Sequence, residues 1–171
     1  LRARRYMHET GTTEEEMASV CVALRKWAEL NPNAMFRKPT SVEEVLASKM
    51  VASPLRAREC NVLADGAAAF IVTSAERARE LTRTPVYVLG TGGSFTHYTV
   101  SQEADMARLG FPQAAKEAYA QAGLGPGDVD IAELYDAYPV FVLIALEGLG
   151  LCPRGEAGKF VAAGNTWPGG K

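Results

Sequence analysis

The sequence predicts an α/β domain in which helices and strands alternate along the chain. Three observations carry this prediction. From Ser74 onward, short apolar segments alternate with segments that have helical periodicity. Two of the apolar segments, 67–73 and 85–89, are continuous, as in strands that are covered on both faces. Stretches rich in glycine and proline, such as 123–127, separate the elements.

The composition is that of an ordinary globular protein of 171 residues, with 47% hydrophobic and 22% charged residues. A net charge of −2 gives no reason to expect nucleic acid or an anionic membrane as a partner. The longest apolar run, 140–146, is too short to span a bilayer. No apolar segment typical of a signal peptide follows the basic start, so we expect a cytoplasmic protein.

The three cysteines are far apart, odd in number and form no CxxC pair. Reduced thiols in a cytosolic setting fit this pattern best. With only two histidines in the chain, a metal site of the Cys/His type is not expected. Cys60 has no base beside it in the sequence, so it is interpreted as a small buried residue rather than a nucleophile.

The first third of the chain predicts two helices and an extended segment. Thr13 and Glu16 have the spacing of a capping box, and an apolar stripe at helical spacing follows them. The segment 31–33 (Asn-Pro-Asn) ends this helix. Ser41 and Glu44 repeat the spacing before a short helix. Residues 50–55 are expected to be extended and to be broken by a proline.

The next part predicts the alternating elements. A small-residue turn at 65–66 leads into the strand 67–73, and Ser74 caps a helix over 75–81. The strand 85–89 is followed by Gly-Thr-Gly-Gly-Ser, which matches neither GxGxxG nor GxxxxGK[ST] and is not followed at once by a helix. A nucleotide-binding loop is therefore excluded. A helix is predicted over 111–122, with a proline in its first turn.

The segment 128–139 is the strongest candidate for a functional site. It reads as a short strand over 128–134 that delivers Tyr135, Asp136 and Tyr138 to its carboxyl end, before an apolar helix over 140–151. Open α/β sheets bind ligands beyond the carboxyl ends of their strands. The alternative is an ordinary strand–helix turn in which Asp136 only caps the helix.

Two other features have a functional and an ordinary interpretation. His97 lies in the polar and aromatic loop 95–103, where it either contacts substrate or is a surface histidine. Arg2, Arg4 and Arg5 near the start form either a solvated basic end or a contact for an anion.

Four stretches together resemble the thiolase superfamily, in particular the sterol-carrier-protein-type thiolases and thiolase-like lipid-transfer proteins, including steroid side-chain aldolases. They are YMHETGTTEEEMASV, VEEVLASKMVASPLRARECNVLADGAAAFIVTS, GFPQAAKEAYAQAGLGPGDVDIAELYDAY and LEGLGLCPRGEAGKFVAAGNTWPGGK. They occur in the family's order and cover nearly the whole chain.

The resemblance implies part of a five-layer αβαβα fold built from two similar halves. Residues 1–75 would be the insertion region and the end of the first half. Residues 76–171 would be an incomplete second half, so the chain is expected to be an internal fragment. The family is usually dimeric, which implies a homodimer in the full-length form.

The resemblance also implies chemistry on acyl-CoA thioesters, with the thioester as substrate and no separate cofactor. Thiolases use a cysteine nucleophile and a Gly-His-Pro motif, and neither has a counterpart in this chain, so the fragment alone is expected to be inactive. Where most thiolases have Asn-Glu-Ala-Phe and the sterol-carrier branch His-Asp-Cys-Phe, this chain has Tyr135, Asp136, Ala137 and Tyr138.

A tyrosine with a pKa of about 10 stays protonated at neutral pH and can donate a hydrogen bond to an oxyanion or an enolate. By resemblance, Tyr135 and Asp136 would be catalytic, with Asp136 orienting the site, and Tyr138 would line the site and bind substrate. His97 is a substrate-binding candidate from its place in the loop 95–103. Aldolases that cleave side chains from steroid-CoA thioesters rely on tyrosines and work with a small OB-fold partner. The expected function is therefore C–C bond cleavage or acyl transfer on acyl-CoA. The alternatives are a non-catalytic acyl-CoA or lipid-binding module and a partner-interaction module.

Overall fold

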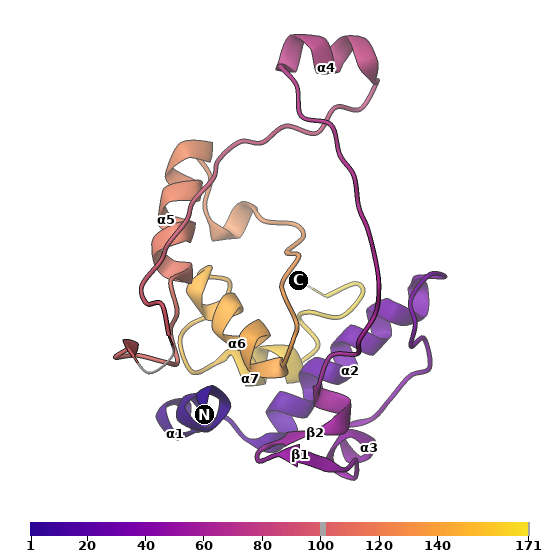
Figure 1. The fold of residues 1–171 in the computed structure, drawn as a ribbon, viewed down its shortest axis with the longest axis vertical. Coiled ribbons are helices and arrows are strands. Elements are labelled where there is room, and N and C mark those ends of the chain that lie inside the picture. Colours follow the sequence, from indigo (N-terminus) through magenta and orange to yellow (C-terminus); the bar gives the residue numbers. More distant parts are fainter. Residues whose placement is uncertain (100–101, 171) are drawn as a thin grey trace.

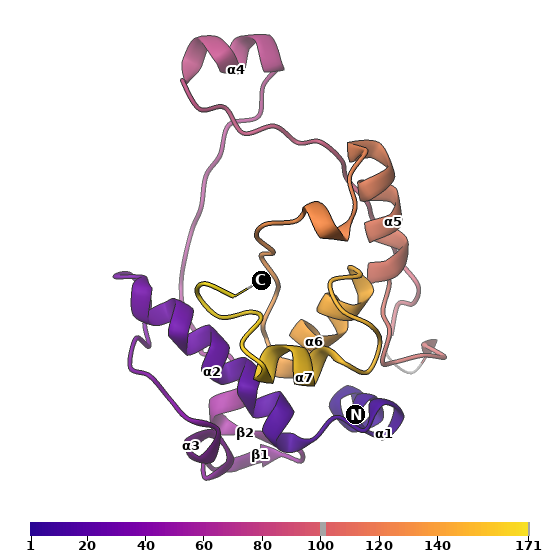
Figure 2. The same cartoon turned by 180° about the vertical axis from the view of Figure 1, so that it is seen from behind.

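The computed structural model describes residues 1–99 and 102–170 (Figure 1). Its body is a cluster of helices made from both ends of the chain: α1 (Arg2–Thr10), α2 (Glu14–Leu30), α6 (Pro139–Gly148) and α7 (Ala157–Ala162). Helix α5 (Phe111–Ala122) packs on α6. Helix α4 (Ala75–Leu81) lies far from this body at the end of two extended segments, as both views show (Figures 1 and 2).

The remaining elements are small. Helix α3 (Val42–Leu46) packs on α2, and strands β1 (Met50–Ala52) and β2 (Leu55–Arg56) pair antiparallel. Single 3-10 turns occupy Ala57–Glu59 and Pro126–Asp128. Within the described residues, β1 and β2 form the one sheet.

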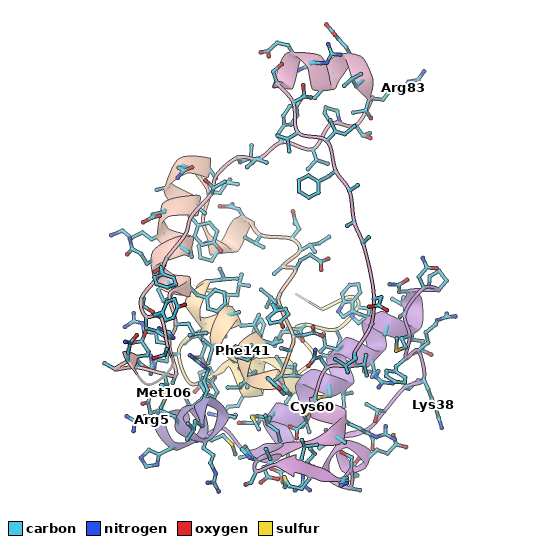
Figure 3. All side chains as sticks on the ribbon, viewed as in Figure 1. Arg5, Lys38, Cys60, Arg83, Met106 and Phe141 are labelled. Atoms are coloured by element: carbon cyan, nitrogen blue, oxygen red, sulfur yellow. The ribbon has the colours of Figure 1, made fainter. Side chains whose placement is uncertain are left out.

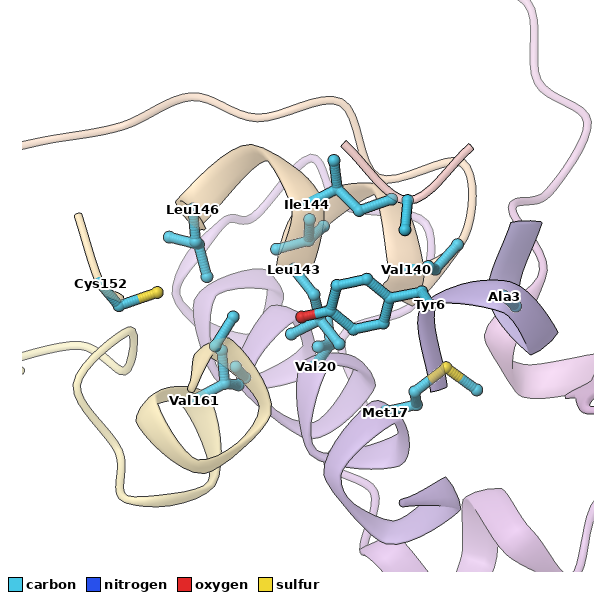
Figure 4. Close-up of a cluster of buried hydrophobic side chains, with 14 residues drawn as sticks. Ala3, Tyr6, Met17, Val20, Val140, Leu143, Ile144, Leu146, Cys152 and Val161 are labelled. Carbon is cyan, nitrogen blue, oxygen red and sulfur yellow. The ribbon is translucent and has the colours of Figure 1, made fainter. Parts of the chain in front are cut away.

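The core is formed where α6 meets α1, α2 and α7. Tyr6 and Met17 are fully buried, and Leu143 and Ile144 of α6 lie against them (Figure 4). Helix α6 is apolar around nearly its whole circumference, which is typical of a helix enclosed by other elements. The first and last thirds of the chain therefore share one hydrophobic core.

The predicted helix starts at Thr13, Ser41 and Ser74 are confirmed. In α2, the Thr13 hydroxyl accepts from the Glu16 N–H at 3.2 Å, and the Glu16 carboxylate accepts from the Thr13 N–H at 3.1 Å. The hydroxyls of Ser41 and Ser74 cap α3 and α4 in the same way. The predicted helices 75–81 and 111–122 match α4 and α5 at both ends.

The three predicted strands of the alternating region are not formed. Segments 67–73, 85–89 and 129–134 have no strand pairing within the described part of the chain. Their apolar side chains face solvent: Ile71 is 90% exposed and Val86 is 95% exposed. A strand exists only through hydrogen bonds to a neighbouring strand, and a continuous apolar strand also needs cover on both faces. Neither lies beside these segments here.

The glycines after segment 85–89 have a packing role. A Cβ atom on Gly90 would lie 2.1 Å from the Ala118 carbonyl oxygen, and one on Gly92 would lie 1.9 Å from that of Ala114. Glycine is thus required for the backbone to lie directly on α5. The exclusion of a nucleotide loop agrees with this packing role.

Helices α1 and α7 are not predicted from the sequence, and the basic start has two interpretations. In the structure, Arg2 donates to the Met106 carbonyl oxygen at 2.7 Å, and Arg5 pairs with Glu9 within α1. Glu9 also pairs with Arg154 at 2.8 Å. The arginines of α1 therefore lie among protein partners that join this helix to later segments.

Candidate functional site

The Tyr135 motif lies on an exposed extended stretch that leads into α6. Tyr135 is 75% exposed, and Asp136 is also exposed. Tyr138 occupies the N-cap position of α6, and no side chain caps this helix end. The alternative in which Asp136 only caps the helix is therefore wrong, and its carboxylate is left for other contacts.

Tyr135 and Asp136 lie in the wall of a cleft of about 860 Å³, hereafter the Tyr135 cleft. The cleft lies between α2, segment 34–39, segment 57–62 and the motif itself. Its other lining residues include Cys21, Leu24, Arg25, Met35, Phe36, Lys38, Glu44, Arg58, Glu59, Cys60, Asn61 and Val62. A space of this size is typical of a small-molecule site.

One backbone hydrogen bond brings the two halves of the cleft together. The Asn61 N–H donates to the Ala137 carbonyl oxygen at 3.3 Å. This contact sets Cys60 and Asn61 directly beside the motif, although they are far from it in sequence. Figure 3 shows Cys60 near the centre of the helical body and Lys38 at its outer edge.

Three cationic side chains line the cleft. The Arg25 guanidinium lies 4.8 Å from the centre of the Phe36 ring and donates to the Lys38 carbonyl oxygen at 3.3 Å. Arg58 donates to the Thr40 hydroxyl at 2.7 Å and pairs with Glu44 at 3.3 Å. Lys38 has no ion pair in the described residues. The cleft can therefore attract an anionic ligand at one end.

The thiols of this chain are not activated. Burial, and secondly the charge of Glu59, raises the pKa of the Cys21 thiol to about 12. Burial and the same carboxylate also raise the pKa of Cys60. Burial and Glu147 raise the pKa of Cys152 to about 11. Nucleophilic cysteines need a lowered pKa, so these three stay as thiols at neutral pH.

Tyr138 does not line the Tyr135 cleft. It is half-buried at the edge of the core, with its ring centre 6.1 Å from that of Phe141. The chain direction explains this placement, because Tyr138 directly precedes α6 and turns with that helix toward the core. Its assignment as a substrate-binding residue stays a prediction.

His97 lies in a separate hollow of about 330 Å³ against the start of α5. Its Nδ1 atom is 2.7 Å from a carboxylate oxygen of Glu103 and 2.8 Å from the Thr96 hydroxyl. The Thr96 hydroxyl, followed by the Asp105 N–H, holds the pKa of Glu103 below its usual range. The structure therefore does not bring His97 together with Tyr135, and its contact with substrate stays a prediction.

Residues 1–99 and 102–170 contain neither a cluster of metal-binding side chains nor a helix that could span a membrane. No group of three or more His, Cys, Asp or Glu residues is placed to hold a metal ion there. No helix in the same ranges is long and apolar enough to cross a membrane.

The sequence analysis missed most residues that share the cleft with Tyr135. The sequence predicts that Arg56, Arg58 and Glu59 are exposed, and this is wrong for Glu59, which is buried. Asn61 is predicted only as part of the family pattern. The Glu59 carboxylate accepts from the Arg56 N–H, but Arg56 has no side-chain acceptor and the pair forms no capping-box signature in the sequence. No sequence pattern shows that this turn contacts residue 137.

The chain is similar to a thiolase family model and to several proteins that are named as thiolases, lyases or aldolases. A family model described as "Thiolase C-terminal domain-like" matches residues 92–171. The benzoylsuccinyl-CoA thiolase subunit BbsB of Thauera aromatica is 41% identical over 100% of this chain and 45% of its own length. The 17-hydroxy-3-oxo-4-pregnene-20-carboxyl-CoA lyase of Mycobacterium tuberculosis is 42% identical over 99% of this chain and 45% of its own.

A steroid side-chain-cleaving aldolase of Thermomonospora curvata is 39% identical over 99% of this chain and 45% of its own. Among solved structures, the Ltp2-ChsH2(DUF35) aldolase superposes with a TM-score of 0.92 at 38% identity, over 99% of this chain and 46% of the other. The chain thus spans about 45% of the length of these curated relatives.

Proposed function

This chain belongs to the thiolase superfamily, and from that membership we propose that it forms part of an enzyme that acts on acyl-CoA thioesters. The finer proposal is C–C bond cleavage or acyl transfer in lipid or steroid metabolism. The single observation that carries it is the Tyr135 cleft, which combines a tyrosine hydroxyl, a carboxylate and a cationic end in one space.

The fold predicted from the sequence is confirmed by this membership. The backbone follows that of the Ltp2-ChsH2(DUF35) aldolase over nearly its whole length, so the chain has an α/β thiolase-like fold. The predicted boundary at residue 75 stays a prediction. It lies before the first residue of the family match, Gly92.

Tyr135 is proposed as the acid of the reaction. A tyrosine hydroxyl can donate a hydrogen bond to a carbonyl oxygen as negative charge develops there. Asp136 is proposed to orient the ligand or the hydroxyl. The raised pKa values of Cys21 and Cys60 argue against a thiolate nucleophile from this segment. The proposed chemistry is therefore acid–base chemistry and needs no cofactor beyond the thioester.

The cationic end of the cleft is proposed to bind the phosphates of coenzyme A. Arg25, Lys38 and Arg58 supply positive charge, and Phe36 and Met35 supply apolar surface beside it. This combination suits a ligand that carries phosphates next to a ring system. The acyl end would then point toward Tyr135.

Two partners are proposed on the strength of the relatives. One solved neighbour is described as an Ltp2-ChsH2(DUF35) aldolase, which names a second component. We propose that the protein containing this chain also works with a small OB-fold partner. We also propose a homodimer, because members of the thiolase superfamily are usually dimeric.

The first test is turnover of acyl-CoA thioesters with short, branched and polycyclic acyl groups. The assay uses the 171-residue chain. If the gene encodes a longer protein, the full-length protein is assayed as well. Thiol release reports acyl transfer, and mass spectrometry of the acyl-CoA reports C–C cleavage. We expect Tyr135→Phe to lower the rate about 100-fold, because general acid catalysis contributes that order of rate enhancement.

Tyr87→Phe is the matched control, since Tyr87 lies on an exposed extended segment outside the cleft. It should leave the rate unchanged. Absence of turnover with every thioester, together with no effect of Tyr135→Phe on ligand binding, would contradict the proposal.

The second candidate function is a non-catalytic acyl-CoA-binding module. The protonated thiols favour it, because thiolases act through an activated cysteine and this chain has none. Saturable binding of acyl-CoA by the whole gene product, without thiol release or a change in acyl mass, would establish it.

A further inference from the structure

Glu59 is an unusual carboxyl group in the wall of the Tyr135 cleft. It ends the 3-10 turn Ala57–Glu59 and lines the same cleft as Tyr135 and Asp136. It is 4% exposed, and among the described residues it is the one charged side chain that is buried. Buried carboxyl groups ordinarily have an ion pair or several hydrogen bonds.

Glu59 has one hydrogen bond in the described structure. Its Oε2 atom accepts from the Arg56 N–H at 2.8 Å. No hydrogen bond to its Oε1 atom is formed by residues 1–99 or 102–170, and Oε1 is not among the fully enclosed polar atoms that lack a partner, so this oxygen is open to a ligand in the cleft.

The cations near Glu59 form no ion pair with it within the described residues, although Arg56 is close enough to offset part of the rise in its pKa that burial causes, and the Nε atom of Arg56 has no hydrogen-bond partner there. The Arg56 guanidinium pairs with Glu14 at 2.8 Å rather than with Glu59. Arg58 bonds to Thr40 and Glu44, and Arg25 lies on the Phe36 ring. No cation of the described chain forms an ion pair with Glu59.

The remaining groups that face Glu59 oppose its ionisation or leave it unchanged. Besides burial, Glu14, which pairs with Arg56, adds a negative charge that raises the pKa of Glu59. Cys21 and Cys60 line the same cleft as neutral thiols. Burial raises the pKa of Glu59, and Arg56 offsets this only in part. The neutral form of the carboxyl is therefore favoured to a higher pH than in an exposed glutamate.

We propose that Glu59, with its proton on Oε1, is a second hydrogen-bond donor of the Tyr135 cleft and binds the carbonyl oxygen of an acyl thioester. This role rests on the proposed function. Two donors, the Tyr135 hydroxyl and the Glu59 carboxyl, would then hold one oxygen atom as charge develops on it, as in other oxyanion sites. No bond to Glu59 is made or broken in this role.

The test compares the binding of acetyl-CoA with that of CoA, which lacks the carbonyl group, between pH 5 and pH 9. At low pH the wild-type chain should bind acetyl-CoA more tightly than CoA. The ratio of the two dissociation constants should fall by about fivefold to tenfold as Glu59 ionises. Glu59→Gln keeps an acceptor for the Arg56 N–H and a neutral donor at every pH. It should therefore keep the preference throughout the range.

Glu43→Gln is the matched control, since Glu43 is exposed on α3 and does not line the cleft. It should follow the wild-type pH profile. Carboxyl carbon NMR gives a second readout, in which one glutamate of raised pKa should disappear in Glu59→Gln.

The outcomes separate the two proposals. If acetyl-CoA and CoA both bind and Glu59→Gln keeps the wild-type pH profile, the role of Glu59 is overturned while the proposed function stands. If Glu59 titrates with an ordinary glutamate pKa, its role is likewise overturned. If neither ligand binds at any pH, the proposed function fails and the role of Glu59 fails with it.

Discussion

At the scale of single residues, Tyr6 joins the two ends of the chain. Its ring is fully buried in the core, and its hydroxyl donates to the Glu147 carboxylate of α6. The same carboxylate oxygen accepts from the Gly155 N–H at 2.8 Å. Burial and then Glu147 raise the pKa of Tyr6, so its hydroxyl remains a donor across the usual pH range.

Tyr6→Phe should therefore lower the free energy of unfolding by about 1 to 3 kcal/mol, the usual cost of losing a hydrogen bond to a charged group. Urea unfolding followed by circular dichroism measures this change. Tyr98→Phe is the control: Tyr98 is 86% exposed, and the change should stay within about 0.5 kcal/mol. Equal effects of the two substitutions would contradict the role given to Tyr6.

The thiols offer a residue-scale prediction with a defined pH dependence. With a pKa of about 12, Cys21 is a thiolate to only about one part in ten thousand at pH 8. Alkylation of Cys21 and Cys152 should therefore be slow in the folded chain and should rise as pH approaches 11. Cys60, which is less buried, should react first. Mass spectrometry of peptides after timed alkylation measures the order, and rapid labelling of Cys21 at pH 8 would refute it.

At the scale of elements, the capping boxes show how local sequence fixes helix positions. The starts of α2, α3 and α4 could be predicted because a hydroxyl and the third following N–H are close in sequence. Helices α1 and α7 are harder to predict because both are short. The apolar face of α1 consists of only Ala3, Tyr6 and Met7 among charged residues, and α7 has six residues. In the site, Tyr135 and Asp136 could be predicted as neighbours, whereas Glu59 and Asn61 reach them only through tertiary contacts.

Removing the N-cap hydroxyl should lower the free energy of unfolding in α2 but not in α4. Thr13→Ala removes the cap of α2, which packs on α3, α6 and α7, and should cost about 1 kcal/mol of global stability. Ser74→Ala removes the cap of α4, which buries no residue, and should leave the global unfolding transition unchanged. Denaturant unfolding of both variants measures the difference. A similar loss in both would show that α4 contributes to the core.

At the scale of the whole molecule, the extended segments on either side of α4 expose large apolar side chains to solvent. Leu63, Phe70, Ile71, Val72 and Val86 are between 78% and 98% exposed. Contiguous apolar surface of this kind usually marks an interface with another part of a protein. The unpaired backbone of the same segments is also available to a neighbouring strand.

The isolated chain should therefore bind an apolar-surface dye and should self-associate at high concentration. Replacing Phe70 and Ile71 by serine should reduce both, without change to the helical body. Dye fluorescence and sedimentation velocity measure the two effects, with Thr73→Ser as the matched control on the same segment. A monomeric chain without dye binding would show that these segments are covered in solution.

The core shared by the two ends of the chain has a consequence for synthesis. Trp27 donates to the Thr166 carbonyl oxygen at 2.7 Å, and α2 packs on α7, so these contacts link segments separated by most of the chain. Ribosomes add roughly 5 to 20 residues per second, so α2 waits roughly 6 to 30 s after its own synthesis for α7 to appear. During that interval, Met17 and Val20 lack Ala157 and Val161 of α7, which belong to the same core cluster. The time needed to translate the middle of the chain thus sets the earliest moment at which the core can close.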